Sequence, residues 1–234
     1  MSSEIFFTLS SGKKVPVIIN NHRGARNVTL RPKVGKNPEI HISKPWMTSS
    51  SFVLKFLESK RKWVEKVFSS VPDTEKITPD MVLEFLGRKV KLVHDSNCRG
   101  NCYLDKEQTI LCIGGGVEMF ERRVRDFIKC ELLKEIKTII KTTPHEYWPK
   151  HITLRDTTSR WGSCSVTGNM SFSWRLAFAP YDVMRYVVMH ELAHTKHMDH
   201  SKEFWANVSE LYGLGVERAK RWLSQNGQSL HRYF

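Results

Sequence analysis

The sequence predicts an α+β fold, in which a β-rich N-terminal region precedes a domain whose helices gather toward the C-terminus. Short runs of β-branched and aromatic residues, separated by Gly, Asn or Pro, dominate residues 4–43. Apolar residues recur at helical spacing over residues 117–142 and again beyond residue 180. Strands and helices that follow in blocks, without regular alternation, are typical of α+β proteins.

The first 113 residues are expected to form a basic, β-rich region with one long helix. Four strands are predicted at residues 6–9, 15–19, 28–31 and 39–42. Thr48 or Ser49 is positioned to cap a helix that reaches about Val67. After a connection over residues 71–80, three more strands are predicted at residues 83–86, 89–93 and 109–112, the first two joined by a tight turn at Gly87.

A run of three glycines marks the expected boundary between two domains, residues 1–113 and 114–234. The run lacks the Lys-Ser/Thr ending of a phosphate-binding loop, so we interpret it as a flexible turn. A helix is predicted over residues 117–142, which Pro144 ends. A strand at residues 151–155 and a hairpin around Gly168, with arms at residues 160–165 and 169–174, follow it.

Composition excludes several protein classes. The chain has 234 residues, 40% of them hydrophobic, which is enough for a proper core. It contains no run of eighteen apolar residues, so no transmembrane helix and no membrane partner are expected. The N-terminus lacks the basic and apolar regions of a secretory signal, which favours a cytoplasmic protein.

Cysteine usage agrees with a reducing compartment. The five cysteines are an odd number, and the Cys98–Cys102 pair has no second pair to complete a structural zinc site. Cys112 and Cys130 are the other residues that would have to approach them. We interpret all of these as free thiols, and Cys164 as a small buried side chain.

The net charge of +13 is concentrated in the N-terminal region. Residues 11–66 hold thirteen Lys or Arg against three Glu, whereas residues 181–234 hold seven basic and six acidic residues. A concentrated positive region attracts phosphate backbones or acidic protein surfaces, so contact with nucleic acid or a nucleotide through the N-terminal region is one expectation. The alternative is a basic surface that is only solvated by water. The sequence contains neither an aromatic platform on which bases could stack nor a helix-turn-helix signature that would favour nucleic-acid binding.

The run His190-Glu191-Leu192-Ala193-His194 carries the clearest chemistry in the chain. Histidines four residues apart on a helix point from the same face. Two neutral imidazoles there can hold a zinc ion, and the glutamate between them can take a proton from metal-activated water. The alternative is a helix with two surface histidines. The flanks argue against it, because unpaired polar groups are costly to bury and these flanks are apolar: Met184, Val187, Val188 and Leu192.

Two downstream histidines compete for the role of third ligand. His200 follows at the spacing of the longer H-E-x-x-H-x-x-G-x-x-H motif, with His197 in place of its glycine, and we favour His200. His197 would then be a supporting donor or a solvent-facing residue. Without glycine the chain must turn by other means, and Asp199 tolerates a left-handed conformation better than most residues. Ser201 is expected to cap the next helix.

Three segments together carry a family resemblance, residues 158–165, 186–194 and 197–205. They resemble the YgjP-like metallopeptidase family, which is distantly related to the SprT-like zinc proteases. The resemblance is strong from about Ile152 to the C-terminus and weaker in residues 26–31 and 56–63. It implies a compact zincin-like domain with one zinc ion per chain. It also implies site residues: His190, His194 and His200 as ligands, and Glu191 as catalytic base.

The expected function is therefore that of a zinc metallopeptidase acting on peptides or proteins. We expect the metal-binding helix to pack beside a small antiparallel sheet, whose exposed edge can pair with an extended peptide. Gly162 would allow a substrate chain to approach closely, and Trp161 is expected to line a pocket or the core. Arg160, His197 and Tyr212 are candidate oxyanion donors.

Two other functions stay open at this stage. Metal-dependent hydrolysis of nucleotides, as in a nucleoside triphosphate pyrophosphatase, suits a basic chain, although no carboxylate cluster supports it. A nucleic-acid-associated protease of SprT-like type is the other, and a binding protein with a vestigial site is disfavoured because Glu191 is present. Zinc is the expected metal, although manganese, cobalt and nickel also suit histidine-rich sites.

Overall fold

The chain divides into two compact units, residues 1–75 and 76–233. The computed structural model describes residues 5–33, 38–69, 75–96, 98 and 102–234. The limit expected at residues 113–114 lies inside the second unit. There the strands that precede it pack with the elements that follow it, as in the 2.7 Å hydrogen bond that the Leu86 amide donates to the Ala177 carbonyl. Part of the connection expected over residues 71–80 lies outside the described residues.

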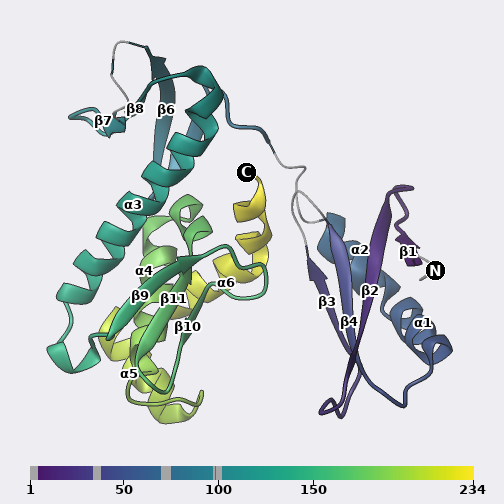
Figure 1. Ribbon diagram of the computed structural model, residues 1–234. Coiled ribbons are helices and arrows are strands. Elements are labelled where there is room, and N and C mark those ends of the chain that lie inside the picture. The colour runs from purple at the N-terminus through teal and green to yellow at the C-terminus, as the bar shows by residue number, and fades with distance from the viewer. Residues whose placement is uncertain (1–4, 34–37, 70–74, 97, 99–101) are drawn as a thin grey trace. The chain divides into compact units, whose positions relative to one another are not determined.

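The first unit is a four-stranded sheet with two helices on one face (Figure 1). Its strands are ordered β1-β2-β4-β3, with bounds Ile5–Thr8, Lys14–His22, Glu39–Pro45 and Thr29–Lys33 in that order. The middle pair is parallel and both outer pairs are antiparallel. Alternate strand residues and one side of each helix form the core, which includes Val15, Val17, Ile40, Ile42, Val53, Leu57 and Val64.

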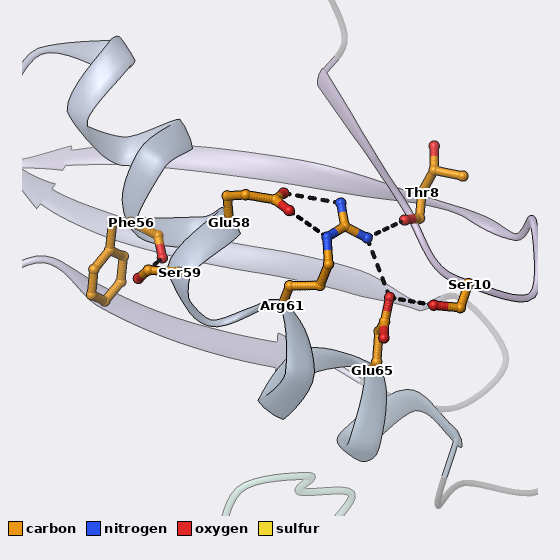
Figure 2. A network of polar contacts seen from close by, with 7 residues as sticks. All are labelled: Thr8, Ser10, Phe56, Glu58, Ser59, Arg61 and Glu65. Carbon is orange, nitrogen blue, oxygen red and sulfur yellow. Dashed lines mark hydrogen bonds and ion pairs between the residues drawn. The ribbon is translucent and has the colours of Figure 1, made fainter.

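The single helix expected up to Val67 is wrong, because two helices are present. Ser49 caps α1 (Ser50–Ser59) as predicted, and α2 (Arg61–Ser69) begins after a break at Lys60. Arg61 holds the break in place (Figure 2). Its guanidinium donates to Glu58 at 2.5 and 2.9 Å, to the Thr8 carbonyl at 3.0 Å and to Glu65 at 3.2 Å, and so links both helices to β1.

The second unit begins with another four-stranded sheet, ordered β5-β6-β8-β7. The bounds are Val82–Phe85, Arg88–Asp95, Ile110–Gly114 and Cys102–Leu104 in that order. Leu86 and Gly87 join β5 to β6 with φ values of 49° and 78°, which confirms the tight turn. Strand β7 was not predicted, because its three residues are too few to show a periodic pattern. The long helix α3 (Phe120–Lys141) follows a 3-10 turn, η1 (Val117–Met119), close to the predicted bounds.

A second small sheet lies beside the C-terminal helices, ordered β10-β11-β9. The predicted hairpin is confirmed: β10 (Gly162–Cys164) and β11 (Asn169–Ser173) are antiparallel, and Gly168 has a φ of 79°. Strand β9 (His151–Arg155) runs parallel to β11, so the expectation of an antiparallel sheet is wrong. This register sets Ile152 and Leu154 of β9 beside buried Met170 and Phe172 of β11, and so gathers the apolar residues on one face.

The remaining elements complete a mixed α+β architecture of three small sheets and six α-helices within the described residues. Three of the helices are C-terminal: α4 (Tyr181–Ala193), α5 (Lys202–Tyr212) and α6 (Val216–Asn226). The 3-10 turns are η2 (His145–Tyr147), η3 (Trp174–Phe178) and η4 (Gly227–His231). Helix α4 contacts α3, α5, α6 and β10, and is therefore the central helix of this part (Figure 1). None of the described helices has the length and apolar character needed to cross a membrane.

Candidate metal centre

Helix α4 carries the first two histidines of the site. Most of its residues are buried, as the apolar flanks predicted, and it ends at His194, which is its C-cap. His190 lies one turn before the cap, and the two imidazole ring centres are 5.1 Å apart. The local helical period is sufficient to place this pair.

The third histidine of the site is His200. One nitrogen from each of His190, His194 and His200 lies within 4.8 Å of the other two, and the Nε2 atoms of His190 and His200 are 3.3 Å apart. The chain turns back toward α4 without a left-handed Asp199, so that expectation is wrong. The Asp199 carboxylate instead accepts a hydrogen bond from the Ser201 amide at 3.3 Å, which closes the turn.

Polar contacts orient two of the three rings, those of His194 and His190. The backbone carbonyl of His197 lies 2.9 Å from Nδ1 of His194, so Nδ1 donates there and Nε2 is left for a metal. The Tyr186 hydroxyl lies 3.5 Å from Nδ1 of His190. His197 therefore serves the site through its carbonyl, while its ring lies outside the cluster.

Helix α5 supplies an aromatic wall behind the rings. Ser201 caps this helix as predicted, by accepting a hydrogen bond from the Phe204 amide at 3.3 Å. The fully buried Phe204 ring stacks on His194, with ring centres 4.5 Å apart, and meets His190 edge-on at 5.0 Å. Trp205 lies 5.7 Å from His190. Rings packed this closely limit the freedom of the imidazoles before any metal binds.

Glu191 is buried, with 6% of its surface exposed, and lies against strand β10. A Cβ atom added to Gly162 would meet its Cγ and Oε1 atoms at 2.6 Å, so the glycine makes room for this carboxylate. Burial raises the pKa of Glu191 to about 7, and the charge of Arg160 opposes the rise. A carboxyl group with such a pKa can both accept and return a proton near neutral pH.

Burial has the opposite effect on the pKa of His190, which it lowers to about 4, with further lowering from His194 and His200. The imidazole is thus neutral at physiological pH, which is the state that binds a metal. Three imidazoles with converging nitrogens are a donor set that suits zinc. By the chemistry of its donors, the cluster could hold a metal ion.

A cleft of about 240 Å³ opens beside this cluster. His190 and Glu191 line it together with Arg160, Trp161, Gly162, Tyr186, Val187 and Leu223. Strand β10 and the residues before it therefore form one wall, and α4 forms the other. This arrangement brings the buried carboxylate and one histidine to a surface that a substrate can reach.

Comparison with known proteins identifies the family. The sequence profile of the YgjP-like metallopeptidase domain matches residues 26–226. The chain belongs to the YgjP-like metallopeptidase family. This confirms the resemblance described above, and membership implies a metal ion and protein or peptide substrates.

One solved structure is similar to part of this YgjP-like chain. It is the metallopeptidase zymogen of Pyrococcus abyssi abylysin, at 23% sequence identity and a TM-score of 0.32. The match covers 43% of this chain and 97% of that one. No curated protein matches the chain.

The YgjP-like site gathers some of the predicted substrate-binding residues and not others. Arg160, Trp161 and Gly162 line the cleft. Tyr212 does not, since its hydroxyl donates to the Asp182 carbonyl at 3.1 Å.

Sequence reasoning missed three residues of the cleft, and Val187, one of them, was expected only as part of the apolar flank of the helix. Tyr186 lies one helical turn before His190, and this spacing could have identified it. Leu223 lies on α6 and has no comparable signal, because only the packing of α6 on α4 brings it to the cleft.

Proposed function

We propose that this chain is a zinc-dependent metallopeptidase that cleaves peptide bonds. His190, His194 and His200 would hold one zinc ion, and Glu191 would act as general base. The observation that carries the proposal is the convergence of three histidine nitrogens within 4.8 Å, beside a buried glutamate that lines a cleft. The free thiols of the five cysteines support the expected cytoplasmic location.

A zinc ion held by three imidazoles supplies Lewis-acid chemistry, which polarises a carbonyl group and makes water more acidic. Glu191 would take the proton of the attacking water molecule and return it to the departing amine. Its buried carboxyl group, with a pKa of about 7, suits both steps. The fit of Glu191 against Gly162 holds the carboxylate on the cleft side of α4.

The cleft also suggests how a peptide is bound. Among the described strands, β10 pairs only with β11, so its other edge is available to an extended chain. Arg160 lines the cleft and would stabilise negative charge that develops on the carbonyl oxygen. Trp161 would form an apolar wall beside it.

The test is metal content and peptide hydrolysis in a panel of single variants. Purified wild type should contain one equivalent of zinc by mass spectrometry, and His194→Ala and His200→Ala should lose it. Glu191→Gln should keep the zinc and lose peptidase activity by at least about 10²-fold, because a general base is removed and the ligands are not.

His197→Ala is the matched control, since only its backbone carbonyl serves the site. This variant should keep the metal. Zinc retained in His200→Ala would contradict the ligand set, and full activity in Glu191→Gln would contradict the mechanism. Hydrolysis of nucleoside triphosphates in place of peptides, with the same dependence on Glu191, would replace the peptidase by a phosphohydrolase.

A further inference from the structure

A second groove, of about 690 Å³, lies on the outer face of the β10-β11-β9 sheet. Gly162 faces Glu191 of α4, and side chains alternate along a strand, so Ser163 points to the opposite face. Ser163, Ser171 and Thr153 are in register across the three strands, and all three line the groove. Their hydroxyl groups make the floor of this outer groove polar.

The outer groove is positively charged. Arg155 and Arg160 line it, and its lining includes no Asp or Glu. Asp156, the nearest acidic residue in sequence, is engaged elsewhere, because it accepts hydrogen bonds from Arg175 at 2.7 and 3.2 Å. Among the described residues, no carboxylate forms an ion pair with Arg155 or Arg160.

The outer groove and the cleft beside Glu191 lie on opposite faces of the same strand, β10. Arg160 lines both, and β10 forms an edge of both. A polypeptide bound along the open edge of β10 would therefore pass the Glu191 cleft and the outer groove together.

We propose that the outer groove binds acidic side chains of the substrate, on one side of the cleaved bond. The proposed peptidase would then prefer polypeptides that carry a cluster of Asp or Glu beside that bond. The inference rests on the proposed function, because it assigns a substrate class to the same site. Arginine and hydroxyl donors match carboxylates, and no Phe, Tyr or Trp lines the groove to stack a nucleic-acid base.

The first experiment compares peptides with a randomised centre that is flanked, on one side or the other, by three Glu or by three Gln. When the acidic residues lie on the correct side of the randomised centre, we expect wild type at low salt to cleave the Glu peptides with a kcat/KM about tenfold higher than that of the Gln peptides. The ratio is modest because each exposed ion pair between Arg and Glu contributes little. Arg155→Gln should reduce this ratio to about threefold, and high salt should do the same. Arg122→Gln, which removes an exposed arginine of α3, should leave the ratio unchanged.

The proposal would be overturned if wild type and Arg155→Gln had the same ratio of kcat/KM for Glu peptides to kcat/KM for Gln peptides. It would also be overturned if wild type had a ratio of one whichever side of the randomised centre carried the Glu residues. A second experiment separates this failure from failure of the peptidase function. Binding is measured by fluorescence anisotropy in Glu191→Gln, with the same peptides and with an oligothymidylate of equal charge.

Wild type could cleave no peptide while the Glu peptides still bind more tightly than the Gln peptides, with a difference that depends on Arg155. In that case the assignment of the outer groove to acidic side chains is supported and the peptidase function is contradicted. If peptides are cleaved but Glu and Gln peptides bind equally, only the groove assignment fails. Tighter Arg155-dependent binding of the oligothymidylate than of the Glu peptides would overturn the assignment in favour of nucleic acid.

Discussion

Gly162 shows how one missing side chain can position a catalytic candidate. Gly162 is the first residue of β10 and lies directly against Glu191. A Cβ atom at this position would lie 2.6 Å from the Cγ and Oε1 atoms of Glu191. Real side-chain carbons do not approach so closely, so any larger residue must displace Glu191. The sequence suggested close approach by a substrate at this position, whereas the structure shows that the neighbour is the chain's own carboxylate.

We predict that Gly162→Ala lowers kcat of the proposed peptidase on the order of 10²-fold, while the proposed zinc content stays at one equivalent. A displaced base costs reaction rate, because proton transfer depends on position within about an ångström. Steady-state kinetics and mass spectrometry measure the two quantities. Gly24→Ala is the control, since a Cβ there meets nothing closer than 3.6 Å. Loss of zinc together with activity would show that the glycine supports the fold and not only Glu191.

At the scale of the element, the start of α5 links helix capping to the candidate metal centre. His200 directly precedes the cap residue Ser201, and Phe204 in the first turn packs on all three histidine rings. The cap that begins the helix therefore also sets the backbone position of the third histidine. Helix α1 has the same kind of cap at Ser49, with an equal 3.3 Å bond to Phe52, but lies in the first unit.

We predict that Ser201→Ala destabilises the helix by about 1 kcal/mol and weakens zinc affinity about fivefold, because His200 becomes less well held. Competition with a chromogenic chelator measures the affinity. Ser49→Ala removes a matching bond and should leave zinc affinity unchanged. If the two variants changed zinc affinity equally, the local link between the cap and His200 would be refuted.

At the scale of the whole molecule, the C-terminal residues complete the core of the second unit around a buried cation. Arg175, 5% exposed, donates to Asp156 and, at 2.7 Å, to the Tyr233 carbonyl. His231 is 1% exposed and lies beside Trp161, with ring centres 5.6 Å apart. Burial, followed by the charge of Arg175, lowers the pKa of His231 to about 4.

We predict that His231 makes a contribution to the stability of the second unit that is lost as the pH falls from 7 to 5. Folded His231 stays neutral in this window, whereas the unfolded chain binds a proton below about pH 6.5, so acid favours unfolding. His231 alone should account for about 2 kcal/mol of the loss. Urea denaturation of metal-loaded wild type and His231→Gln measures it, with exposed His151→Gln as control. An equal pH dependence in wild type and His231→Gln would contradict the prediction.

The function of the basic N-terminal region is also a question about the whole molecule. Its predicted contact with nucleic acid or a nucleotide stays a prediction. The sequence of the first unit contains an excess of Lys and Arg. Charge alone does not distinguish a surface that binds a phosphate backbone from a basic surface that is only solvated by water.

The sequence by itself determined the features that depend on local spacing. His190 and His194 share a helical face because 3.6 residues make a turn, Ser201 begins the next helix because its hydroxyl meets an amide three residues on, and Gly168 turns a hairpin because it tolerates a positive φ. Each of these depends on residues within one or two turns of chain. Such interactions form within the segment itself and do not require contacts with distant parts of the chain.

Only the tertiary structure decided the features that depend on contacts between distant segments. Packing placed Gly162 against Glu191, brought Leu223 of α6 to the cleft, and turned the Tyr212 hydroxyl away to Asp182. Arg61, the first residue of α2, links the end of α1 to β1 at a break that helical periodicity does not predict. The physical reason is the same in each case: a side chain is positioned by the partners with which it is buried, and the spacing of residues along the chain does not identify those partners.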